Sequence, residues 1–184
     1  MRDCFLAVDL FSDFSHEDGD RLLASLRERA VGLVRALEHA RARSLPVVYA
    51  NDSFGVWNGD VRGLVQRALD GPGGDVLAKV APHDDDAFIV KPRYSAFDLT
   101  PLALVLDDFE VERLLLVGTA TEMCVAQTAI DARERGYKVT VITEACATVD
   151  PLLERTALNY LEGVTGTWLA PSIDAALQVP ASTA

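Results

Sequence analysis

The fold of this 184-residue chain is decided by the segment of residues 114–125, which reads LLLVGTATEMCV. The segment begins with an unbroken apolar run, and a short run of this kind predicts a strand that is buried on both faces of a sheet. Small residues follow Gly118, and helical character returns at Glu122, with Thr121 in the position of an N-cap. The segment therefore predicts a parallel strand that leads directly into a helix, with Cys124 in or near the first turn of that helix.

The rest of the chain repeats this alternation of strands and helices. Predicted strands cover residues 4–10, 46–50, 87–91, 113–117, 137–142 and 165–169. Predicted helices cover residues 18–43, 61–69, 102–109, 122–135, 151–161 and 172–177. This alternation favours a doubly wound parallel sheet, and we predict an α/β fold in three layers. We assign residues 1–178 to this single domain and residues 179–184 to a frayed C-terminal tail.

Composition limits the partners that the chain can have. The formal net charge is −11, which argues against nucleic acid and anionic membranes as partners. No apolar run approaches the roughly 18 residues of a membrane span. The three cysteines are odd in number and irregularly spaced, so they predict neither a disulfide framework nor a zinc site. The first residues also lack the long apolar core and the cleavage site of a signal peptide, and we therefore expect a cytoplasmic protein.

Cys124 is a candidate nucleophile because of its place in the predicted fold. Ligands of open α/β sheets bind outside the carboxyl ends of the strands, and Cys124 lies just after such an end. A helix N-terminus favours the thiolate form of a cysteine. The alternative is that Cys124 is a small buried hydrophobic residue at a tight junction, since buried free cysteines are common.

Three chemically active residues follow or end three separate strands: Asp9, Lys91 and Cys124. A parallel sheet brings these ends to one edge, so residues that are far apart in sequence can meet there. A thiol nucleophile needs a base that takes its proton and returns it to the leaving group, and Asp9 can do both. Lys91 would keep the carboxylate and the thiolate compatible and would lower the pKa of the thiol. Taken singly, Asp9 and Lys91 can equally be solvated strand-end charges; together with Cys124 they favour catalysis.

Three blocks of sequence resemble the isochorismatase-like cysteine hydrolases. These are LAVD at residues 6–9 with Phe14 shortly after, VKPRYSAF at residues 90–97, and GTATEMCV at residues 118–125. The blocks occur in the family's order, and the resemblance spans about residues 4 to 170. The superfamily includes nicotinamidases, N-carbamoylsarcosine amidohydrolases, and biuret and ureidoacrylate hydrolases.

The resemblance implies a Rossmann-like sheet of about six parallel strands and a catalytic Asp-Lys-Cys triad formed by Asp9, Lys91 and Cys124. It also implies a non-proline cis peptide just before Ala120, which aims the N–H groups of Ala120 and Cys124 at an oxyanion. The implied reaction is attack of the Cys124 thiolate on a small amide or ureido substrate, with a thioester intermediate and no cofactor. Family members usually assemble, so the resemblance implies a homodimer or homotetramer.

The departures from the family bear on the metal and the substrate. Nicotinamidases bind a metal through an Asp-x-His motif after the second strand, where this chain has Asp52-Ser53-Phe54, and no histidine lies between His39 and His83. We therefore predict no metal site, and the chain resembles a metal-free subgroup of small bacterial members. His83, next to three aspartates, is interpreted as part of a solvated turn.

Aromatic residues are candidates for the substrate pocket. We predict substrate contacts for Phe14, Phe54, Trp57 and Tyr94, and Phe97 is a weaker candidate; each can equally be ordinary packing. Cys146 and Thr148 are expected in a loop after the fifth strand, near the active edge of the sheet.

Two other functions stay open. Isochorismatases proper hydrolyse a vinyl ether with an acidic Asp and lack the cysteine, so such an activity would need Asp9 and not Cys124. The chain can also be an inactive family member that serves as a binding module.

Overall fold

The computed structural model describes residues 1–178, so the predicted frayed tail lies outside the described part of the chain. The strands are β1 (Asp3–Val8), β2 (Val47–Asp52), β3 (Ala87–Lys91), β4 (Arg113–Thr119), β5 (Lys138–Ala147) and β6 (Trp168–Ala170). The helices are α1 (Gly19–Ala42), α2 (Val61–Leu69), α3 (Gly74–Leu77), α4 (Leu102–Asp108), α5 (Ala126–Glu134), α6 (Pro151–Tyr160) and α7 (Ile173–Leu177). Shorter turns are the 3-10 turn η1 (Ala78–Val80) and the π-helical turns η2 (Thr121–Val125) and η3 (Leu161–Thr165).

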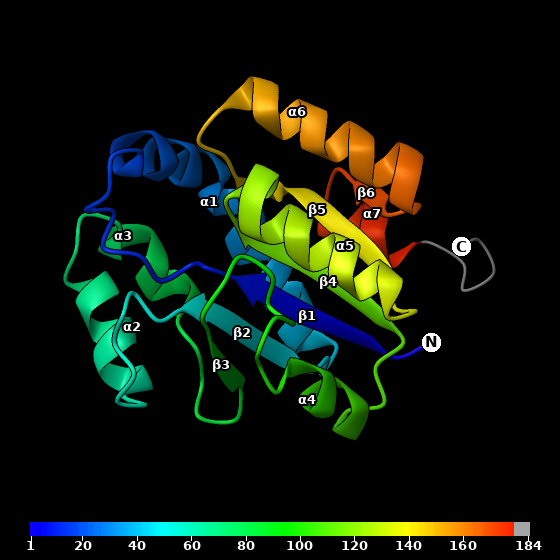
Figure 1. Cartoon of the computed structure of the whole chain (residues 1–184), viewed down its shortest axis with the longest axis horizontal. Helices are drawn as coiled ribbons and strands as arrows, with labels where there is room; N and C mark the ends of the chain where they lie inside the picture. Colours follow the sequence, from blue (N-terminus) through cyan, green and yellow to red (C-terminus); the bar gives the residue numbers. More distant parts are fainter. Residues whose placement is uncertain (179–184) are drawn as a thin grey trace.

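The six strands form one parallel sheet in the order β3-β2-β1-β4-β5-β6. Buried residues of α1, α2, α3 and α7 pack on one face of this sheet, and those of α4 and α5 pack on the other, with α6 beside them. In Figure 1, α5 lies in front of β4 and α1 lies behind the sheet. The predicted three-layer α/β fold with about six parallel strands is confirmed.

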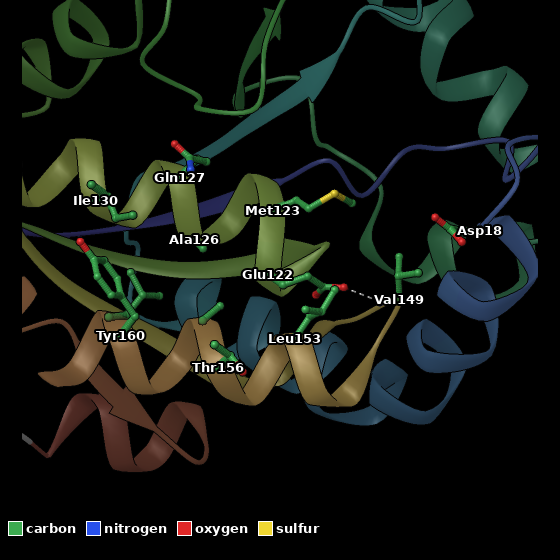
Figure 2. A pocket seen from close by; sticks show the side chains of 12 residues that line it. Asp18, Glu122, Met123, Ala126, Gln127, Ile130, Val149, Leu153, Thr156 and Tyr160 are labelled. Atoms are coloured by element: carbon green, nitrogen blue, oxygen red, sulfur yellow. Dashed lines mark hydrogen bonds between the residues drawn. The ribbon is translucent and has the colours of Figure 1, made fainter. Parts of the chain in front are cut away.

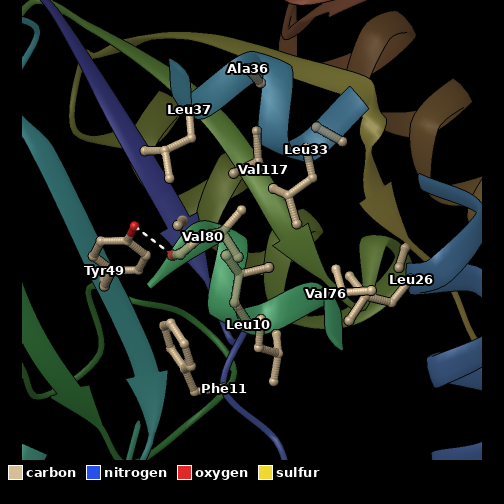
Figure 3. Packing of buried hydrophobic residues seen from close by; sticks show 14 of the residues in the cluster. Leu10, Phe11, Leu26, Leu33, Ala36, Leu37, Tyr49, Val76, Val80 and Val117 are labelled. Carbon is tan, nitrogen blue, oxygen red and sulfur yellow. Dashed lines mark hydrogen bonds between the residues drawn. The ribbon is translucent and has the colours of Figure 1, made fainter. Parts of the chain in front are cut away.

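The strands at the centre of the sheet are buried on both faces, as their continuous apolar runs predict. In β4, Leu115 and Val117 face the α1 side, whereas Leu114 and Leu116 face the α5 side. Figure 3 shows Val117 next to Leu33 and Ala36 of α1, within a cluster that continues to α3 and η1. The core therefore has two halves, which the sheet separates and which together fix the positions of the strand ends.

Gly118 is required where β4 passes closest to β1. Its φ is +135°, and a Cβ atom built there would lie 2.0 Å from the carbonyl oxygen of Val8. No other residue combines this conformation with such a close approach of two backbones. The ends of β1 and β4, which precede Asp9 and Cys124, are thereby held next to each other.

Two features of the fold differ from the prediction. β5 continues to Ala147, so Cys146 lies inside the strand, pairs with Gly118 and is fully buried. The prediction ended this strand too early because Thr143 and Glu144 are polar, and the register shift between Leu116 and Gly118 lets the strand continue past them.

The second difference is α3 and η1, which the sequence pattern did not predict. These short elements contain only seven residues between them and follow a run of glycine and proline. Their formation depends on tertiary contacts: Val76, Leu77 and Val80 are buried, and the Tyr49 hydroxyl donates a hydrogen bond of 2.8 Å to the Val80 carbonyl (Figure 3).

No helix within residues 1–178 is long and apolar enough to cross a membrane. The three cysteines, Cys4, Cys124 and Cys146, are all free and buried.

Candidate active site

The carboxyl edge of the sheet brings together the three residues that the sequence singled out. Asp9 follows β1 directly, Lys91 is the last residue of β3, and Cys124 lies in η2 after β4. The strand β2 lies between β1 and β3, and its last residue, Asp52, pairs in register with Lys91. The long Lys91 side chain spans the width of β2 to reach Asp9.

Lys91 connects the other two side chains. Its Nζ atom lies 2.6 Å from Asp9 Oδ2, 2.8 Å from the Arg93 carbonyl oxygen and 3.6 Å from Cys124 Sγ. The Lys91 side chain is fully buried. An ammonium group has three N–H donors, and each of them has an acceptor here. The cation is therefore fixed between a carboxylate and a thiol.

Asp9 is held by its backbone as well as its side chain. Its N–H donates to the Ala50 carbonyl at 2.9 Å, and its own carbonyl accepts a 2.6 Å hydrogen bond from Thr119 Oγ1. Asp9 Oδ1 accepts a 2.6 Å hydrogen bond from the N–H of Asp52. The φ of Asp9 is +50°, a left-handed conformation that aspartate adopts more readily than most residues. These contacts aim the carboxylate at Lys91 and Cys124.

Burial and the neighbouring charges shift the pKa of all three groups. Burial raises the pKa of the Cys124 thiol, Asp9 raises it further, and Lys91 lowers it without reversing the shift. Burial likewise raises the pKa of Asp9, against the lowering effects of Lys91 and of a hydrogen bond with Cys124. Burial alone lowers the pKa of Lys91, but Asp9 and Cys124 raise it above its ordinary value.

Lys91 lowers the thiol pKa as predicted, but the pKa of Cys124 is still raised overall. The sequence placed Cys124 near a helix N-terminus and a lysine, both of which favour the thiolate. In the folded protein, burial and the adjacent Asp9 raise the pKa of Cys124 by more than Lys91 lowers it. Cys124 is thus a thiol next to a carboxylate whose raised pKa makes it a stronger base, and this pair can transfer the proton during attack.

The turn that carries Cys124 is wider than an ordinary helical turn. The Thr119–Ala120 peptide bond is cis, and the Ala120 carbonyl accepts hydrogen bonds from the N–H groups of Met123 at 3.0 Å and Val125 at 3.3 Å. Cys124 lies in the first turn, where N–H groups have no carbonyl one turn earlier to bind. Widened turns of this π type occur often at functional sites.

The prediction that Thr121 caps this helix is wrong. Ala120 occupies the N-cap position, and Thr121 is the first residue of the turn. The Thr121 side chain instead contacts the carbonyl of Ala147 and the carboxylate of Glu154. The hydroxyl therefore joins the turn to β5 and α6.

Three of the five aromatic candidates for substrate contact are exposed. Phe54 and Trp57 lie in the loop after β2, and Tyr94 lies in the loop after β3. Phe54 also lines a small cavity of about 160 Å³, together with Phe11 and Arg67. Both loops leave the carboxyl edge of the sheet, on which Lys91 also lies. A contact with substrate stays a prediction for each of these residues.

The other two aromatic candidates are buried. Phe14 belongs to the core under α1, and its ring packs so close to Gly73 that a Cβ atom there would lie 2.4 Å from Phe14 Cε2. Phe97 stacks on Tyr137, with the Arg135 guanidinium 4.9 Å from the centre of the Phe97 ring. Phe97 therefore packs the segment after β3 against Arg135 and Tyr137, which follow α5.

A further cavity lies on the outer side of the Cys124 helix. It measures about 460 Å³ and opens between α5 and α6, as Figure 2 shows. Its lining includes Ile130, Leu153 and Tyr160, with Glu122 and Met123 toward the end near the Cys124 turn. Asp9, Lys91 and Cys124 are not part of its lining, so this cavity is distinct from the predicted site.

The loop residues considered for a metal have other contacts. Asp52 Oδ1 accepts a 2.7 Å hydrogen bond from the N–H of Phe54, and the N–H of His83 donates to Asp86 Oδ2 at 2.7 Å. Within the described part of the chain, no group of three or more His, Cys, Asp or Glu side chains is arranged to hold a metal ion.

With this geometry in view, the comparisons with known proteins identify the family. The protein-family model described as "Isochorismatase domain" matches residues 3–170 of the sequence. The chain therefore belongs to the isochorismatase family. This family of hydrolases includes amidases such as nicotinamidase and ureidoacrylate amidohydrolase. The resemblance inferred from the three sequence blocks is confirmed.

Two relatives and one solved structure illustrate the similarity. The isochorismatase family protein YaaI of Bacillus subtilis is 31% identical over 159 residues, covering 86% of this chain and 88% of that protein. A protein of Arabidopsis thaliana described as a probable inactive nicotinamidase is also 31% identical over 159 residues, with 79% and 81% covered. The crystal structure of N-carbamoylsarcosine amidase from Thermoplasma acidophilum matches with a TM-score of 0.73 at 25% identity, covering 95% of this chain and 98% of that one.

Several residues around the site were missed by the sequence analysis. Asp52 was considered only as the remnant of a metal motif, yet its N–H binds Asp9 and its charge raises the pKa of Lys91. Its position at the end of β2 was a signal that could have identified it. Thr119 and Glu154 carried no such signal, because only the folded chain brings them to Asp9 and Thr121.

Proposed function

We propose that this protein is a cysteine-dependent amidohydrolase that cleaves the C–N bond of a small amide or ureido compound through a thioester intermediate. One observation carries the proposal: Lys91 Nζ lies 2.6 Å from Asp9 Oδ2 and 3.6 Å from Cys124 Sγ. A base, a cation and a thiol are then within reach of one another, as nucleophilic catalysis requires. Membership of a hydrolase family that includes amidases supports this class of reaction.

In the first half of the reaction, Cys124 Sγ attacks the carbonyl carbon and its proton passes to the Asp9 carboxylate. We assign the N–H groups of Ala120 and Cys124 to the oxyanion that forms. Asp9 then returns the proton to the leaving nitrogen, the C–N bond breaks, and ammonia or an amine departs. Lys91 keeps its charge throughout and stabilises the negative charge that develops between Asp9 and Cys124.

In the second half, a water molecule attacks the carbonyl of the thioester, or of the thiocarbamate that a ureido substrate leaves, while Asp9 accepts one of its protons. The C–S bond breaks, the proton returns to the Cys124 sulfur, and a carboxylic acid or a carbamic acid is released. Asp9, Lys91 and Cys124 supply every proton transfer and charge that these steps need, so we propose a reaction without a cofactor. We propose that Phe14, Phe54, Trp57 and Tyr94 shape the substrate pocket.

The test is release of ammonia from a panel of small carboxamides and ureido compounds. We expect hydrolysis by the wild type, a loss of about 10⁴-fold or more in Cys124→Ala and Asp9→Asn, and near wild-type rates in Cys146→Ala. Mass spectrometry of the stalled reaction should find the acyl group on Cys124. Undiminished hydrolysis by Cys124→Ala would contradict the proposal, and cleavage of isochorismate that needs Asp9 but not Cys124 would establish a vinyl-ether hydrolase instead.

A second candidate is an inactive family member that binds a small molecule without turnover. The relative described as a probable inactive nicotinamidase favours it. This candidate predicts that panel compounds bind to the wild type, and equally to Cys124→Ala, without acylation or release of ammonia.

A further inference from the structure

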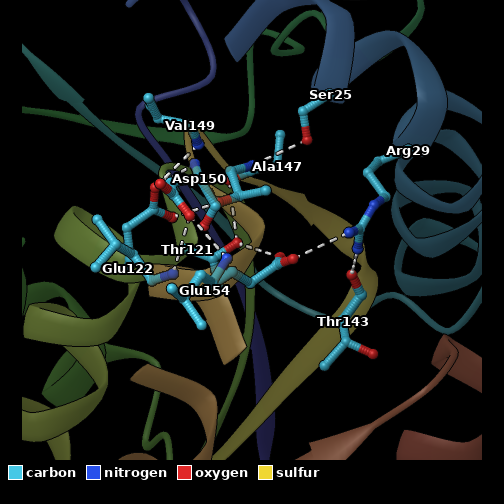
Figure 4. Close-up of polar contacts among 12 residues, drawn as sticks. Ser25, Arg29, Thr121, Glu122, Thr143, Ala147, Val149, Asp150 and Glu154 are labelled. Carbon is cyan, nitrogen blue, oxygen red and sulfur yellow. Dashed lines mark hydrogen bonds and ion pairs between the residues drawn. The ribbon is translucent and has the colours of Figure 1, made fainter. Parts of the chain in front are cut away.

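We infer that Glu154, held by Arg29 of α1, is a positioning residue for the turn that carries Cys124, and that it acts through Thr121. The inference rests on the proposed cysteine hydrolase function. It assigns a role to a network of polar side chains on the α1 and α6 side of this turn, which Figure 4 shows.

Thr121 is the link between the network and the site. It is fully buried and begins η2, three residues before Cys124. Its Oγ1 lies 3.0 Å from the Ala147 carbonyl oxygen and 3.0 Å from Glu154 Oε1. The single hydroxyl proton thus serves two acceptors, one on β5 and one on α6, and the start of the turn is fixed to both elements.

Glu154 is itself fixed from the other side. Its Oε2 lies 3.2 Å from Arg29 Nη2, and Arg29 Nη1 donates a 2.6 Å hydrogen bond to the Thr143 carbonyl. The side chains of Arg29 and Glu154 are 29% and 11% exposed, so water competes little for the carboxylate. A carboxylate in the first turn of α6 is also stabilised by the helix dipole. The contacts from Arg29 to Glu154 and from Glu154 to Thr121 therefore hold the Thr121 side chain in one orientation.

Glu122, the next residue of the turn after Thr121, is also held by hydrogen bonds of its side chain. Its Oε1 accepts hydrogen bonds from the N–H groups of Val149 at 2.9 Å and Asp150 at 3.2 Å, and its Oε2 accepts one from Thr148 Oγ1 at 2.8 Å. The N–H of Thr148 donates to Ser25 Oγ on α1 at 3.0 Å. Thr121 is thus attached to β5 and α6, and Glu122 to the segment between them, and both sets of contacts continue to α1 (Figure 4).

This attachment matters because the proposed oxyanion donors lie on either side of it. The N–H of Ala120 precedes Thr121 and Glu122 in the chain, and the N–H of Cys124 follows them. A displacement of about 1 Å in a catalytic arrangement can reduce the rate about 100-fold. Donors that stabilise only the transition state affect kcat, whereas general stability affects neither kcat nor KM of the folded enzyme.

The experiment compares variants of the network with a matched control. Glu154→Gln removes the charge from the Arg29 ion pair, Thr121→Val removes the hydroxyl, and Thr121→Ser retains it. The control is Asp86→Asn, which weakens the ion pair between Asp86 and Arg41, also on α1. That pair has a distance of 2.8 Å and side-chain exposures of 8% and 24%, close to those of Glu154 and Arg29, but it has no bond to η2.

Two readouts are taken at a temperature well below the unfolding midpoint of each variant. The first is kcat and KM for the amide of the panel that the wild type hydrolyses best. The second is the Kd, measured by NMR, of a ¹³C-labelled small aldehyde that forms a hemithioacetal with Cys124. For Glu154→Gln and Thr121→Val we expect kcat to fall about 10- to 100-fold with KM nearly unchanged, and the aldehyde Kd to rise by a similar factor. Thr121→Ser should restore most of kcat, and Asp86→Asn should leave both readouts unchanged while its unfolding midpoint falls.

Wild-type values in Glu154→Gln and Thr121→Val would overturn the positioning role and leave the proposed function intact. An equal loss of kcat in Asp86→Asn would also overturn it, since the effect would then be one of general stability. A wild type that neither hydrolyses the panel nor binds the aldehyde at Cys124 would refute the proposed function, and the positioning role with it.

Discussion

Replacing Lys91 by methionine should destabilise the protein as well as inactivate it. The side chain is fully buried, and its ammonium group bonds Asp9, the Arg93 carbonyl and Cys124. Methionine fills a similar volume but leaves the Asp9 carboxylate without its cation. The Asp9 side chain is only 11% exposed, so water does not replace the lost cation well. Removing one partner of a buried ion pair costs about 3–5 kcal/mol. This is a large share of the roughly 5–15 kcal/mol that keeps a domain folded.

The loss should depend on pH. The ordinary pKa of Asp9 is 3.8, burial raises it in the folded protein, and Lys91 opposes this rise. When the pKa of a carboxyl group is higher in the folded protein than in the unfolded chain, the group stabilises the folded state at pH values below its pKa in the unfolded chain. This contribution is lost as the pH rises through its pKa in the folded protein. Lys91→Met raises the folded pKa of Asp9 further. The difference in stability between wild type and variant therefore grows from acid to neutral pH, by about 1.4 kcal/mol for each unit of added pKa.

The assay is urea unfolding of wild type, Lys91→Met and the double variant Asp9→Asn/Lys91→Met between pH 5 and pH 8. The double variant removes both charges, so it should recover about 2 kcal/mol or more of the loss at neutral pH and should depend less on pH. A destabilisation of Lys91→Met that is the same at every pH, or a double variant less stable than the single one, would refute the reasoning that an uncompensated Asp9 charge causes the loss.

Three further predictions concern the thiol, the close approach of β1 and β4, and α6. Because the pKa of Cys124 is raised above its ordinary value of 9.0 by burial and by Asp9, alkylation by iodoacetamide should still accelerate above pH 9, and Asp9→Asn should shift this profile to lower pH; peptide mass spectrometry at Cys124 checks both. Gly118→Ala places a Cβ atom 2.0 Å from the Val8 carbonyl and should lower the free energy of unfolding by about 3 kcal/mol or more, measured in urea. Asp150→Ala removes the carboxylate that accepts two backbone N–H groups of α6 and should cost about 1 kcal/mol, and an unchanged thermal midpoint would contradict this role.

Much of the architecture followed from local pattern. The apolar run before Gly118 predicted a strand buried on both faces, and β4 is such a strand. The pair Asp150-Pro151 predicted the start of α6, and the Asp150 side chain caps it. These predictions succeeded because burial periodicity and capping act within a few residues. The continuation of β5 through Cys146 was missed because a register shift against β4 decides it, and no local pattern reports a partner strand.

The candidate site was predictable in part for the same reason. Asp9 and Lys91 lie at the ends of predicted strands and Cys124 follows one, and parallel strands bring their ends to one edge. The wider network was not predictable from the sequence. The local pattern around Thr121 indicates a helix cap, and its hydrogen bond to Glu154 forms only when the folded chain brings α6 next to η2.

By itself, the sequence determined the order of the elements, the parallel sheet and the set of reactive residues at its carboxyl edge. Only the tertiary structure decided the balance of pKa shifts within that set. Lys91 lowers the thiol pKa as the residue types suggest, but burial and the adjacent carboxylate raise it by more. Residue identity gives the sign of each interaction, whereas its strength depends on distances and desolvation, and these exist only after strands from distant parts of the chain have packed together.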